Sequence, residues 1–541
     1  MKTVAEVVLA RRDDPNPALS FEARSWTWAE VVDEMVRRAA ILTELAPEAP
    51  PHVGVLLDNT PEYLFCLGGA ALCGRVVVGL NSTRRGDELA RDIRHTDCAT
   101  VVTDAEHRRL LDGLDLGKAA VVDVDGEAWR ERASAVVPEL PTTAPSPEDL
   151  YLLLFTAGST GAPKAVRATH ARAARAADSV MGFQPGDVLY CAMPMFHGNA
   201  LFSTILPAMG AGAATALRRK FSASAVLDDV RASGAVFFST VGRALAYILA
   251  TPPTPDDRDH KLRFVLAPES ATSDVDAFQE RFGCPVVSGY GSSENVIIFL
   301  PQPGLPKDAL GVPEADADVA VIDPETGEEC PPARFDEAGR LRNADEAIGE
   351  IVSRNGLGRF EGYYNNDEAT AQRTRGGWYW SGDLGYRDAD GVFYFAGRTA
   401  DWLRVDGENF AAAPVERVLA SAPGVTGAVV FGVPDERTVD DQVMAVLEVA
   451  DPTAFDPEEF DAYLQSRRDL GTKWTPRYVR LLSRLPLTAT NKVDKTWLRR
   501  ERWDGDGRVL WRPDRKGPLR PLTEADRAAL ADAIGHRGRV T

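Results

Sequence analysis

An apolar run that leads directly into a loop of glycines, hydroxyl residues and one lysine constrains this chain more than any other stretch. The run is Leu152–Phe155, and the loop after it contains Gly158 and Gly161. Without a Cβ, these two glycines let the backbone fold tightly and present its N–H groups to an anion. The other donors of the loop are hydroxyl groups and one ammonium: Thr156, Ser159, Thr160 and Lys164. The pattern predicts a polyphosphate cradle, with a plain Gly/Ser-rich surface turn as the alternative.

A second strand also runs into glycine and hydroxyl residues, and here the loop ends in a carboxylate. The strand is Val286–Val287, and the residues that follow are Gly289, Tyr290, Gly291, Ser292, Ser293 and Glu294. A lone glutamate in a loop is usually solvated. Beside a triphosphate, the carboxylate of Glu294 is suited to bind the magnesium ion that neutralises the phosphates. Tyr290, between two glycines, can lie flat against a purine.

Three further elements follow, within Trp380–Tyr386, Gly397–Asn409 and Pro486–Lys495. In the first of them, the carboxylate of Asp383 can accept hydrogen bonds from both hydroxyls of a ribose. In this order and spacing, the five elements resemble the adenylate-forming superfamily, which comprises acyl-CoA synthetases, adenylation domains of peptide synthetases and luciferases. The resemblance covers nearly the whole chain. It is nearest to the actinobacterial fatty-acid–CoA ligases of the fatty-acid transport protein-like branch, on Gly397-Arg398-Thr399, Gly407-Glu408-Asn409 and Phe196–Ala200.

The resemblance assigns roles to residues that would otherwise pass for surface or core positions. Lys492 falls at the family's catalytic lysine, which swings into the cleft and holds the α-phosphate and carboxylate oxygens as charge develops. Arg398 is expected to contact the ribose or a phosphate. His197 is expected to gate or orient the carboxylate substrate. Ala400 lies at the expected hinge, and Gly407 is expected to line the CoA channel once the small domain rotates.

The chain departs from the family pattern where the resemblance places the substrate. The residues expected around the acid are His197, Ser239, Arg243, Ala267, Pro268, Asn295 and Val296, and Glu269 and Ser270 are expected near the adenine. Ala267, Pro268, Asn295 and Val296 add side-chain volume, which predicts a small or aryl acid rather than a long fatty chain. Arg243 can pair with an anion, and a solvated surface arginine is an equal alternative.

The activity implied by the resemblance is that of an ATP-dependent ligase with ATP, Mg²⁺ and CoA. It would activate a carboxylate as an acyl-AMP and transfer the acyl group to CoA. An alternative within the same fold is a diazotase that activates nitrite for attack by an aryl amine. A third hypothesis, a catalytically dead nucleotide-binding scaffold, is disfavoured because Glu294, Asp383, Arg398 and Lys492 are all present.

Length and alternation predict an α/β protein of at least two domains. The chain has 541 residues, more than one ordinary domain. Strands expected at 53–57, 75–80 and 100–104, with helices at 61–73 and 86–95 between them, predict parallel-rich sheets covered by helices. A small β-rich subdomain is expected from residue 348, with a hairpin turn at Asp390-Gly391. We predict a large domain over residues 1–399 and a small mobile α+β domain over 400–541 that carries Lys492.

Composition narrows the partners. The net charge of −19 disfavours nucleic acid. No apolar run approaches the roughly 20 residues of a membrane span. The start of the chain has no signal-type core, and its six scattered cysteines lack metal-ligand spacing. These features predict a cytoplasmic monomer or homodimer.

Overall fold

The computed structural model describes the chain in segments. They are residues 2–137, 139–156, 164–178, 181–268, 270, 272–300, 302, 304–307, 309–314, 316–324, 326–337, 341–398, 402–405, 408–434, 441–467, 470, 473–488, 493–514 and 517–537. They fall into two compact units. The first comprises Met1–Pro301 and Gly356–Gly376, and the second comprises Gln302–Asn355, Gly377–Thr488 and Lys492–Thr541. The boundary expected between residues 399 and 400 lies outside the described residues and stays a prediction.

The first unit contains a mostly parallel sheet with the strand order β18-β8-β7-β4-β3-β5-β6. Its strands are β3 (His52–Leu56), β4 (Val76–Gly79), β5 (Thr100–Thr103), β6 (Ala120–Asp123), β7 (Leu150–Thr156), β8 (Lys164–Thr169) and β18 (Tyr363–Tyr364). The strands from β7 to β6 pair in parallel, whereas β8 and β18 add antiparallel strands at one edge. The expected strands at 53–57, 75–80 and 100–104 are thus confirmed as β3, β4 and β5.

A second sheet of this unit has the order β13-β12-β11-β9-β10-β1-β2. Its strands are β1 (Pro17–Phe21), β2 (Arg24–Thr27), β9 (Val188–Cys191), β10 (Ala214–Leu217), β11 (Phe237–Ser239), β12 (Phe264–Leu266) and β13 (Val286–Val287). The pairs are parallel except for β1 with β2. Because parallel neighbours end at the same edge, the loops after β9, β11, β12 and β13 gather there.

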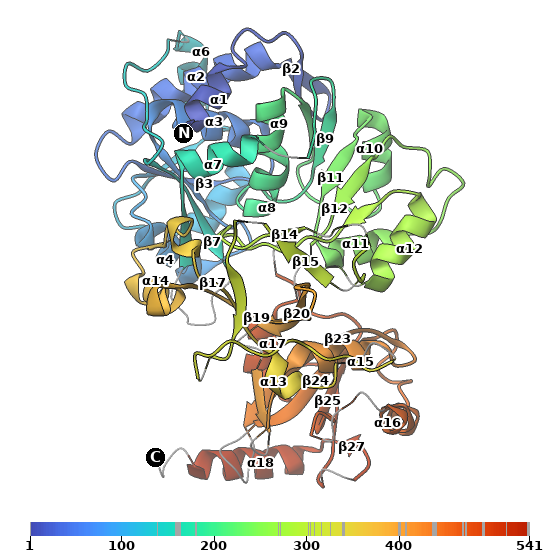
Figure 1. The fold of residues 1–541 in the computed structure, drawn as a ribbon. Coiled ribbons are helices and arrows are strands. Elements are labelled where there is room, and N and C mark those ends of the chain that lie inside the picture. The colour runs from blue at the N-terminus through green and yellow to red at the C-terminus, as the bar shows by residue number, and fades with distance from the viewer. Residues whose placement is uncertain are drawn as a thin grey trace. The chain divides into compact units, whose positions relative to one another are not determined.

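Helices cover these sheets with apolar faces. They are α1 (Val4–Leu9), α2 (Trp28–Leu45), α3 (Pro61–Cys73), α4 (Gly86–His95), α5 (Ala105–Arg108), α6 (Glu127–Ala135), α7 (His170–Ala177), α9 (Leu206–Ala211), α10 (Val226–Ser233), α11 (Gly242–Leu249), α12 (Thr272–Phe282) and α14 (Asp367–Arg373). The expected helices at 61–73 and 86–95 are confirmed as α3 and α4. Figure 1 shows α10, α11 and α12 around β11 and β12, and a cluster including Val230, Leu245 and Phe278 fills the space between them.

The second unit begins with an antiparallel sheet that contains the order β15-β20-β19-β17-β16. These strands are β15 (Ala309–Pro313), β16 (Val319–Ile322), β17 (Gly349–Ser353), β19 (Tyr379–Arg387) and β20 (Phe393–Arg398). The hairpin of β19 and β20 turns at the expected Asp390-Gly391, where Gly391 has a φ of 81°. The expected β-rich piece is therefore confirmed.

A second sheet of this unit, with the order β23-β24-β25-β26-β27, has its own core. Its strands are β23 (Val425–Pro434), β24 (Asp441–Val449), β25 (Tyr478–Leu482), β26 (Arg508–Trp511) and β27 (Arg520–Pro521). A hairpin of β21 (Trp402–Val405) and β22 (Glu408–Ala411) precedes it. The helices are α15 (Ala412–Ala420), α16 (Pro457–Ser466), α17 (Lys495–Glu501) and α18 (Glu524–Arg537). The predicted α/β class, with parallel-rich sheets followed by a smaller α+β part, is confirmed.

Two further features of the fold concern the apolar character of its helices and the state of its cysteines. Among the described residues, no helix combines the length and apolar character that crossing a bilayer requires. All six cysteines are buried and unpaired.

Candidate active site

The loop that carries Glu294 is a tight turn fixed from two sides. Asn295 donates its backbone N–H to Ser292 and has a φ of 54°, a left-handed conformation that asparagine tolerates better than most residues. Arg172, buried on α7, donates a hydrogen bond to the carbonyl of Ser293. As a result, the carboxylate of Glu294 points into the protein and is 6% exposed.

Three side chains of the first unit surround this carboxylate: Tyr363, Arg373 and Lys164. The Tyr363 hydroxyl donates a 2.5 Å hydrogen bond to Oε1 of Glu294, and Nε of Arg373 lies 3.3 Å from the same hydroxyl. Nζ of Lys164 lies 5.9 Å from the centroid of the Tyr363 ring. Strand pairing produces this arrangement, because β18 places Tyr363 opposite Val166 on the strand that begins at Lys164.

Opposite charges compensate one another in this cluster. Burial opposes ionisation of Glu294, but the Arg373 guanidinium and the hydrogen bond from Tyr363 hold the pKa of its carboxyl below the ordinary value. The pKa of Lys164 is lowered overall, because burial and the neighbouring Arg373 outweigh the opposing effect of Glu294. A buried, ionised carboxylate beside two cations suits both a hard divalent cation and the phosphate oxygens that accompany it.

Other described residues that are predicted to contact the nucleotide include Tyr290 in the first unit, and Asp383 and Arg398 in the second. Tyr290 exchanges backbone hydrogen bonds with Phe299, and their ring centroids are 5.6 Å apart. In the second unit, Asp383 on β19 lies opposite Arg398 on β20. The Asp383 N–H is held by Ser381, whose hydroxyl donates to the carbonyl of Ile351. The two residues predicted to contact ribose are thus cross-strand neighbours in the backbone.

The loop that carries His197 is held by a buried asparagine. The Asn59 amide donates to the carbonyl of Met193 at 2.9 Å and accepts from the N–H of Met195 at 2.9 Å. The His197 N–H donates to the carbonyl of Pro194, so the imidazole stands at the start of α8 (Gly198–Ala200). Gly79 is required beside this loop, because a Cβ there would lie 2.8 Å from the Phe196 carbonyl oxygen.

The predicted substrate residues converge at the ends of β11 and β12. The Ser239 hydroxyl donates to the side-chain oxygen of Asn199 at 2.7 Å. Asn199 lies two residues after His197 in the chain. Backbone hydrogen bonds join Thr240 to Leu266 at 2.8 Å, and another joins Gly242 to Pro268 at 3.0 Å. The structure therefore brings together the loops that carry His197, Ser239 and Pro268.

Not every predicted pocket side chain faces open space. Ala267 is 0% exposed and belongs to the hydrophobic cluster behind the sheet, and Val296 is 3% exposed. Ser270 donates its hydroxyl to the carbonyl of Ala267 and so closes the turn after β12. The predicted effect of residues 267, 268, 295 and 296 on substrate size stays a prediction.

Several predicted site residues lie outside the described residues. These are Gly158, Ser159, Thr160, Gly161, Glu269, Ala400, Gly407 and Lys492, and the same holds for the side chains of Arg243 and Arg398. The segments that flank the Lys492 loop are described. Leu487 and Val493 form a bridge at its base, Asp494 caps α17, and Lys495 pairs with Glu416 at 2.9 Å.

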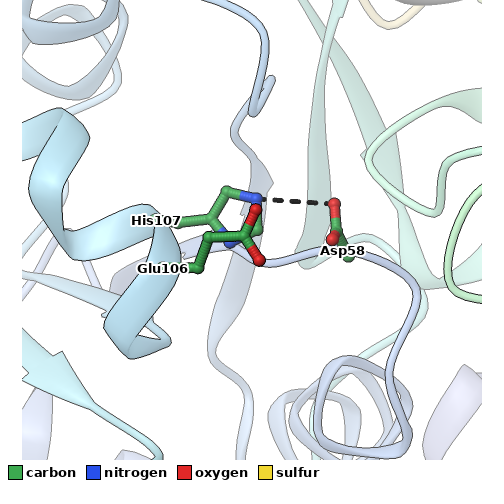
Figure 2. A group of neighbouring side chains, drawn as sticks. All are labelled: Asp58, Glu106 and His107. Atoms are coloured by element: carbon green, nitrogen blue, oxygen red, sulfur yellow. Dashed lines mark ion pairs between the residues drawn. The ribbon is translucent and has the colours of Figure 1, made fainter.

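A second titratable cluster lies at the carboxyl ends of β3 and β5. Figure 2 shows the side chains of Asp58, Glu106 and His107 side by side. Their potential ligand atoms lie within 4.8 Å of one another. Nδ1 of His107 lies 2.7 Å from Oδ1 of Asp104, and its Nε2 lies 3.4 Å from Oδ1 of Asp58. Nζ of Lys220 lies 3.1 Å from the other oxygen of Asp58.

The protonation of His107 argues against a metal site in this second cluster. Hydrogen bonds to Asp104 and Asp58 raise the pKa of His107 to about 9, although burial opposes the shift. A histidine that binds a metal must be neutral and must offer a lone pair. Here the imidazolium and the Lys220 ammonium already neutralise the carboxylates, so the group is an ion-pair network.

Sequence reasoning missed four residues that shape the candidate site: Asn59, Arg172, Tyr363 and Arg373. Tyr363 lies 69 residues after Glu294 and reaches it through the pairing of β18 with β8, and Arg373 lies farther along the chain, at the end of α14. Asn59 and Arg172 act on loops that lie far from them in the sequence. The sequence offers one signal, since Gly362 precedes Tyr363 and has a φ of 79°, which marks a constrained turn.

Comparison with known proteins agrees with this geometry. Residues 8–364 match the AMP-binding enzyme family, and residues 414–492 match the C-terminal domain of AMP-binding enzymes. Steroid-22-oyl-CoA synthetase of Rhodococcus jostii RHA1 is 48% identical over 99% of this chain and 98% of its own length. A medium/long-chain-fatty-acid–CoA ligase, FadD17 of Mycobacterium marinum, is 42% identical over 92% of this chain and 95% of its own.

A solved structure supports the fold. ATP-bound MatB of Rhodopseudomonas palustris superposes with a TM-score of 0.79 at 23% identity, over 92% of this chain and 99% of that one. The family matches and these relatives lend no support to the diazotase alternative. The chain belongs to the AMP-binding enzyme family, and within it to the adenylate-forming acyl-CoA ligases, which use ATP to activate a carboxylate as acyl-AMP and then pass the acyl group to CoA.

Proposed function

We propose that the acid activated by this ligase is a steroid carboxylate, with the carboxyl group on a short side chain of a bulky ring system. The observation that carries the proposal is the 48% identity to a steroid-22-oyl-CoA synthetase, which extends over 99% of this chain. A medium- or long-chain fatty acid is the second candidate, because FadD17 is 42% identical over 92% of the chain. The prediction of a small or aryl acid, made from residues 267, 268, 295 and 296, is the third.

Residues of the first unit would bind the reactants of the adenylation half-reaction. A carboxylate oxygen of the acid attacks the α-phosphorus of ATP, and pyrophosphate leaves. Lys164 would pair with the departing phosphates. Glu294 would hold the magnesium ion, which neutralises the phosphate charge when it is bound. His197, fixed by the Asn59-held loop, would orient the acid.

The second unit would supply the other contacts. Asp383 would accept from the ribose hydroxyls, and Arg398 would contact the ribose or a phosphate. Lys492 would stabilise the charge that develops in the transition state. For the second half-reaction, in which the CoA thiol displaces AMP from the acyl carbon, Gly407 would line the thiol's path. We also propose a cytoplasmic enzyme, which accords with six buried, unpaired thiols.

A substrate panel tests the proposal. AMP release would be measured in the presence of CoA with a steroid-22-oic acid, fatty acids from C8 to C16, benzoate and acetate. A separate reaction would contain nitrite and an aryl amine without CoA. The steroid acid should show the highest kcat/KM, by about tenfold or more, because each buried methylene-sized group contributes about 0.8 kcal/mol. Preference for C12–C16 acids would assign the fatty-acid activity instead. Preference for benzoate or acetate would support the narrowed pocket.

A further inference from the structure

The hydrogen bonds around Glu294 form a directed chain. Nε of Arg373 donates to the Tyr363 hydroxyl at 3.3 Å, and that hydroxyl donates to Oε1 of Glu294 at 2.5 Å. A carboxylate can accept about four hydrogen bonds or metal contacts. The short bond from Tyr363, together with hydrogen bonds from Ser292 and from the backbone of Glu294, restrains the carboxylate without exhausting its capacity.

Tyr363 is itself held rigidly. It is 3% exposed, its backbone pairs with Val166, and its N–H donates to the hydroxyl of Thr370 at 3.1 Å. Next to this strand, Glu361 accepts hydrogen bonds from the backbone N–H and the hydroxyl of Thr169, at 2.8 and 2.7 Å. The phenol thus projects from a strand pinned to β8, on which Lys164 also lies.

We propose that Tyr363 is a positioning residue that holds the Glu294 carboxylate in the orientation needed to bind magnesium with ATP, and that Arg373 holds the Tyr363 hydroxyl. This inference rests on the proposed role of Glu294 as the magnesium ligand. A free glutamate side chain has three rotatable bonds, so loss of the Tyr363 bond allows other rotamers and weakens the site.

The neighbouring tyrosine provides a matched control. Tyr364 lies on the same strand, and its hydroxyl also donates to a carboxylate, Oδ2 of Asp97, at 2.9 Å. Phenylalanine at either position removes one hydroxyl that donates to an acid and leaves the ring in place. Of these two tyrosine hydroxyls, that of Tyr363 is the one that donates to Glu294.

The test measures ATP binding by calorimetry across a magnesium titration, with no acid present, so that the identity of the acid does not affect it. In Tyr363→Phe, half-maximal binding should need about tenfold more magnesium, the size expected for one lost hydrogen bond to a charged group. Tyr364→Phe should match the wild type. In the ligase reaction, the Tyr363→Phe defect should appear at low magnesium and should largely disappear at saturation.

Second variants keep the result decisive. Arg373→Gln should shift the magnesium requirement in the same direction, by about two- to threefold or more, because it removes both the donor to the phenol and a guanidinium charge that favours the ionised form of Glu294. An unchanged magnesium titration for Tyr363→Phe, or a lowered melting temperature with no magnesium shift, would overturn the inference. If Glu294→Gln leaves the magnesium titration unchanged, Glu294 is not a magnesium ligand, and the inference about Tyr363 is overturned as well. Failure of the steroid acid in the substrate panel would leave it standing.

Discussion

The carboxylates of Glu294 and Asp58 are both buried, yet their surroundings differ in a way that separates chemistry from scaffolding. Glu294 is 6% exposed and has a phenol and a guanidinium nearby, with Lys164 beyond the phenol. Asp58 is 8% exposed and contacts an imidazolium and an ammonium directly. Among the described residues, the cations near Glu294 are Lys164 and Arg373, whereas the second cluster combines Asp58 with Asp104 and Glu106.

This difference suggests what each cluster does. Lysine and arginine beside a buried carboxylate can pair with phosphate oxygens, and the carboxylate can bind the accompanying metal ion, so the Glu294 cluster is suited to a phosphate-bearing ligand. The Asp58 network lies where ligands often bind in parallel sheets, but its ions already satisfy one another. Substitutions around Glu294 should therefore change catalysis, and substitutions around Asp58 should change stability.

The largest effect should come from Lys492, the predicted catalytic lysine. Lys492→Ala should lower pyrophosphate release by ~10²–10³-fold while ATP binding survives, as expected for a lost transition-state contact. Lys495→Ala is the control, because that lysine pairs with Glu416 and should alter the rate by less than about threefold. Equal loss of ATP binding in Lys492→Ala would mark it as a binding or folding residue.

The next largest effect concerns stability. His107→Gln removes the cation between Asp58 and Asp104 and should lower the free energy of unfolding by about 2–4 kcal/mol, because it leaves buried carboxylates uncompensated. Urea unfolding would measure the loss. At a temperature where the variant is folded, its KM for ATP should equal that of the wild type. A raised magnesium requirement in this variant would contradict the separation of the two clusters.

The same network predicts a pH dependence. Because the pKa of His107 is raised to about 9 from an ordinary value of about 6.5 in the unfolded chain, its stabilisation is full below pH 6.5 and is lost as pH rises through 9. The difference in melting temperature between wild type and His107→Gln should shrink from pH 6 to pH 9.5. A difference that stays constant would show that His107 is not the titrating group.

The smallest effect should come from the exposed end of the network. The Lys220 side chain is 60% exposed, so its pairing with Asp58 is screened by solvent. Lys220→Ala should lower the free energy of unfolding by no more than about 1 kcal/mol. A loss as large as that of His107→Gln would mean that the ammonium, rather than the imidazolium, carries the compensation.

Local patterns in the sequence predicted a good part of this fold and site. Apolar runs and the alternation of strand and helix patterns gave β3, β4, α3 and α4 close to their observed bounds, because those signals are contained within each segment. Loop chemistry alone singled out Lys164 and Glu294, which the structure places in one cluster and whose roles stay predictions. The family resemblance added Asp383 and Arg398, which the structure places opposite each other.

The parts that the sequence did not reveal depend on contacts between distant segments. Tyr363 reaches Glu294 only because β18 joins the edge of β8, and no local pattern specifies that pairing. Asn59 likewise acts on Met193 and Met195, more than 130 residues away. Ala267 was predicted to narrow the pocket, and that effect stays a prediction; the structure adds that its methyl group packs in a hydrophobic cluster, which residue type alone does not reveal.

The most direct test of the account is acid-dependent exchange of pyrophosphate into ATP, measured in parallel for the wild type, Glu294→Gln and Asp58→Asn at subsaturating magnesium. We predict exchange by the wild type and, at a temperature where it is folded, by Asp58→Asn. Glu294→Gln should lose at least about tenfold, recovered in part by added magnesium. Exchange by Glu294→Gln at the wild-type rate, or an equal magnesium-sensitive loss in Asp58→Asn, would contradict the assignment of the chemistry to the Glu294 cluster.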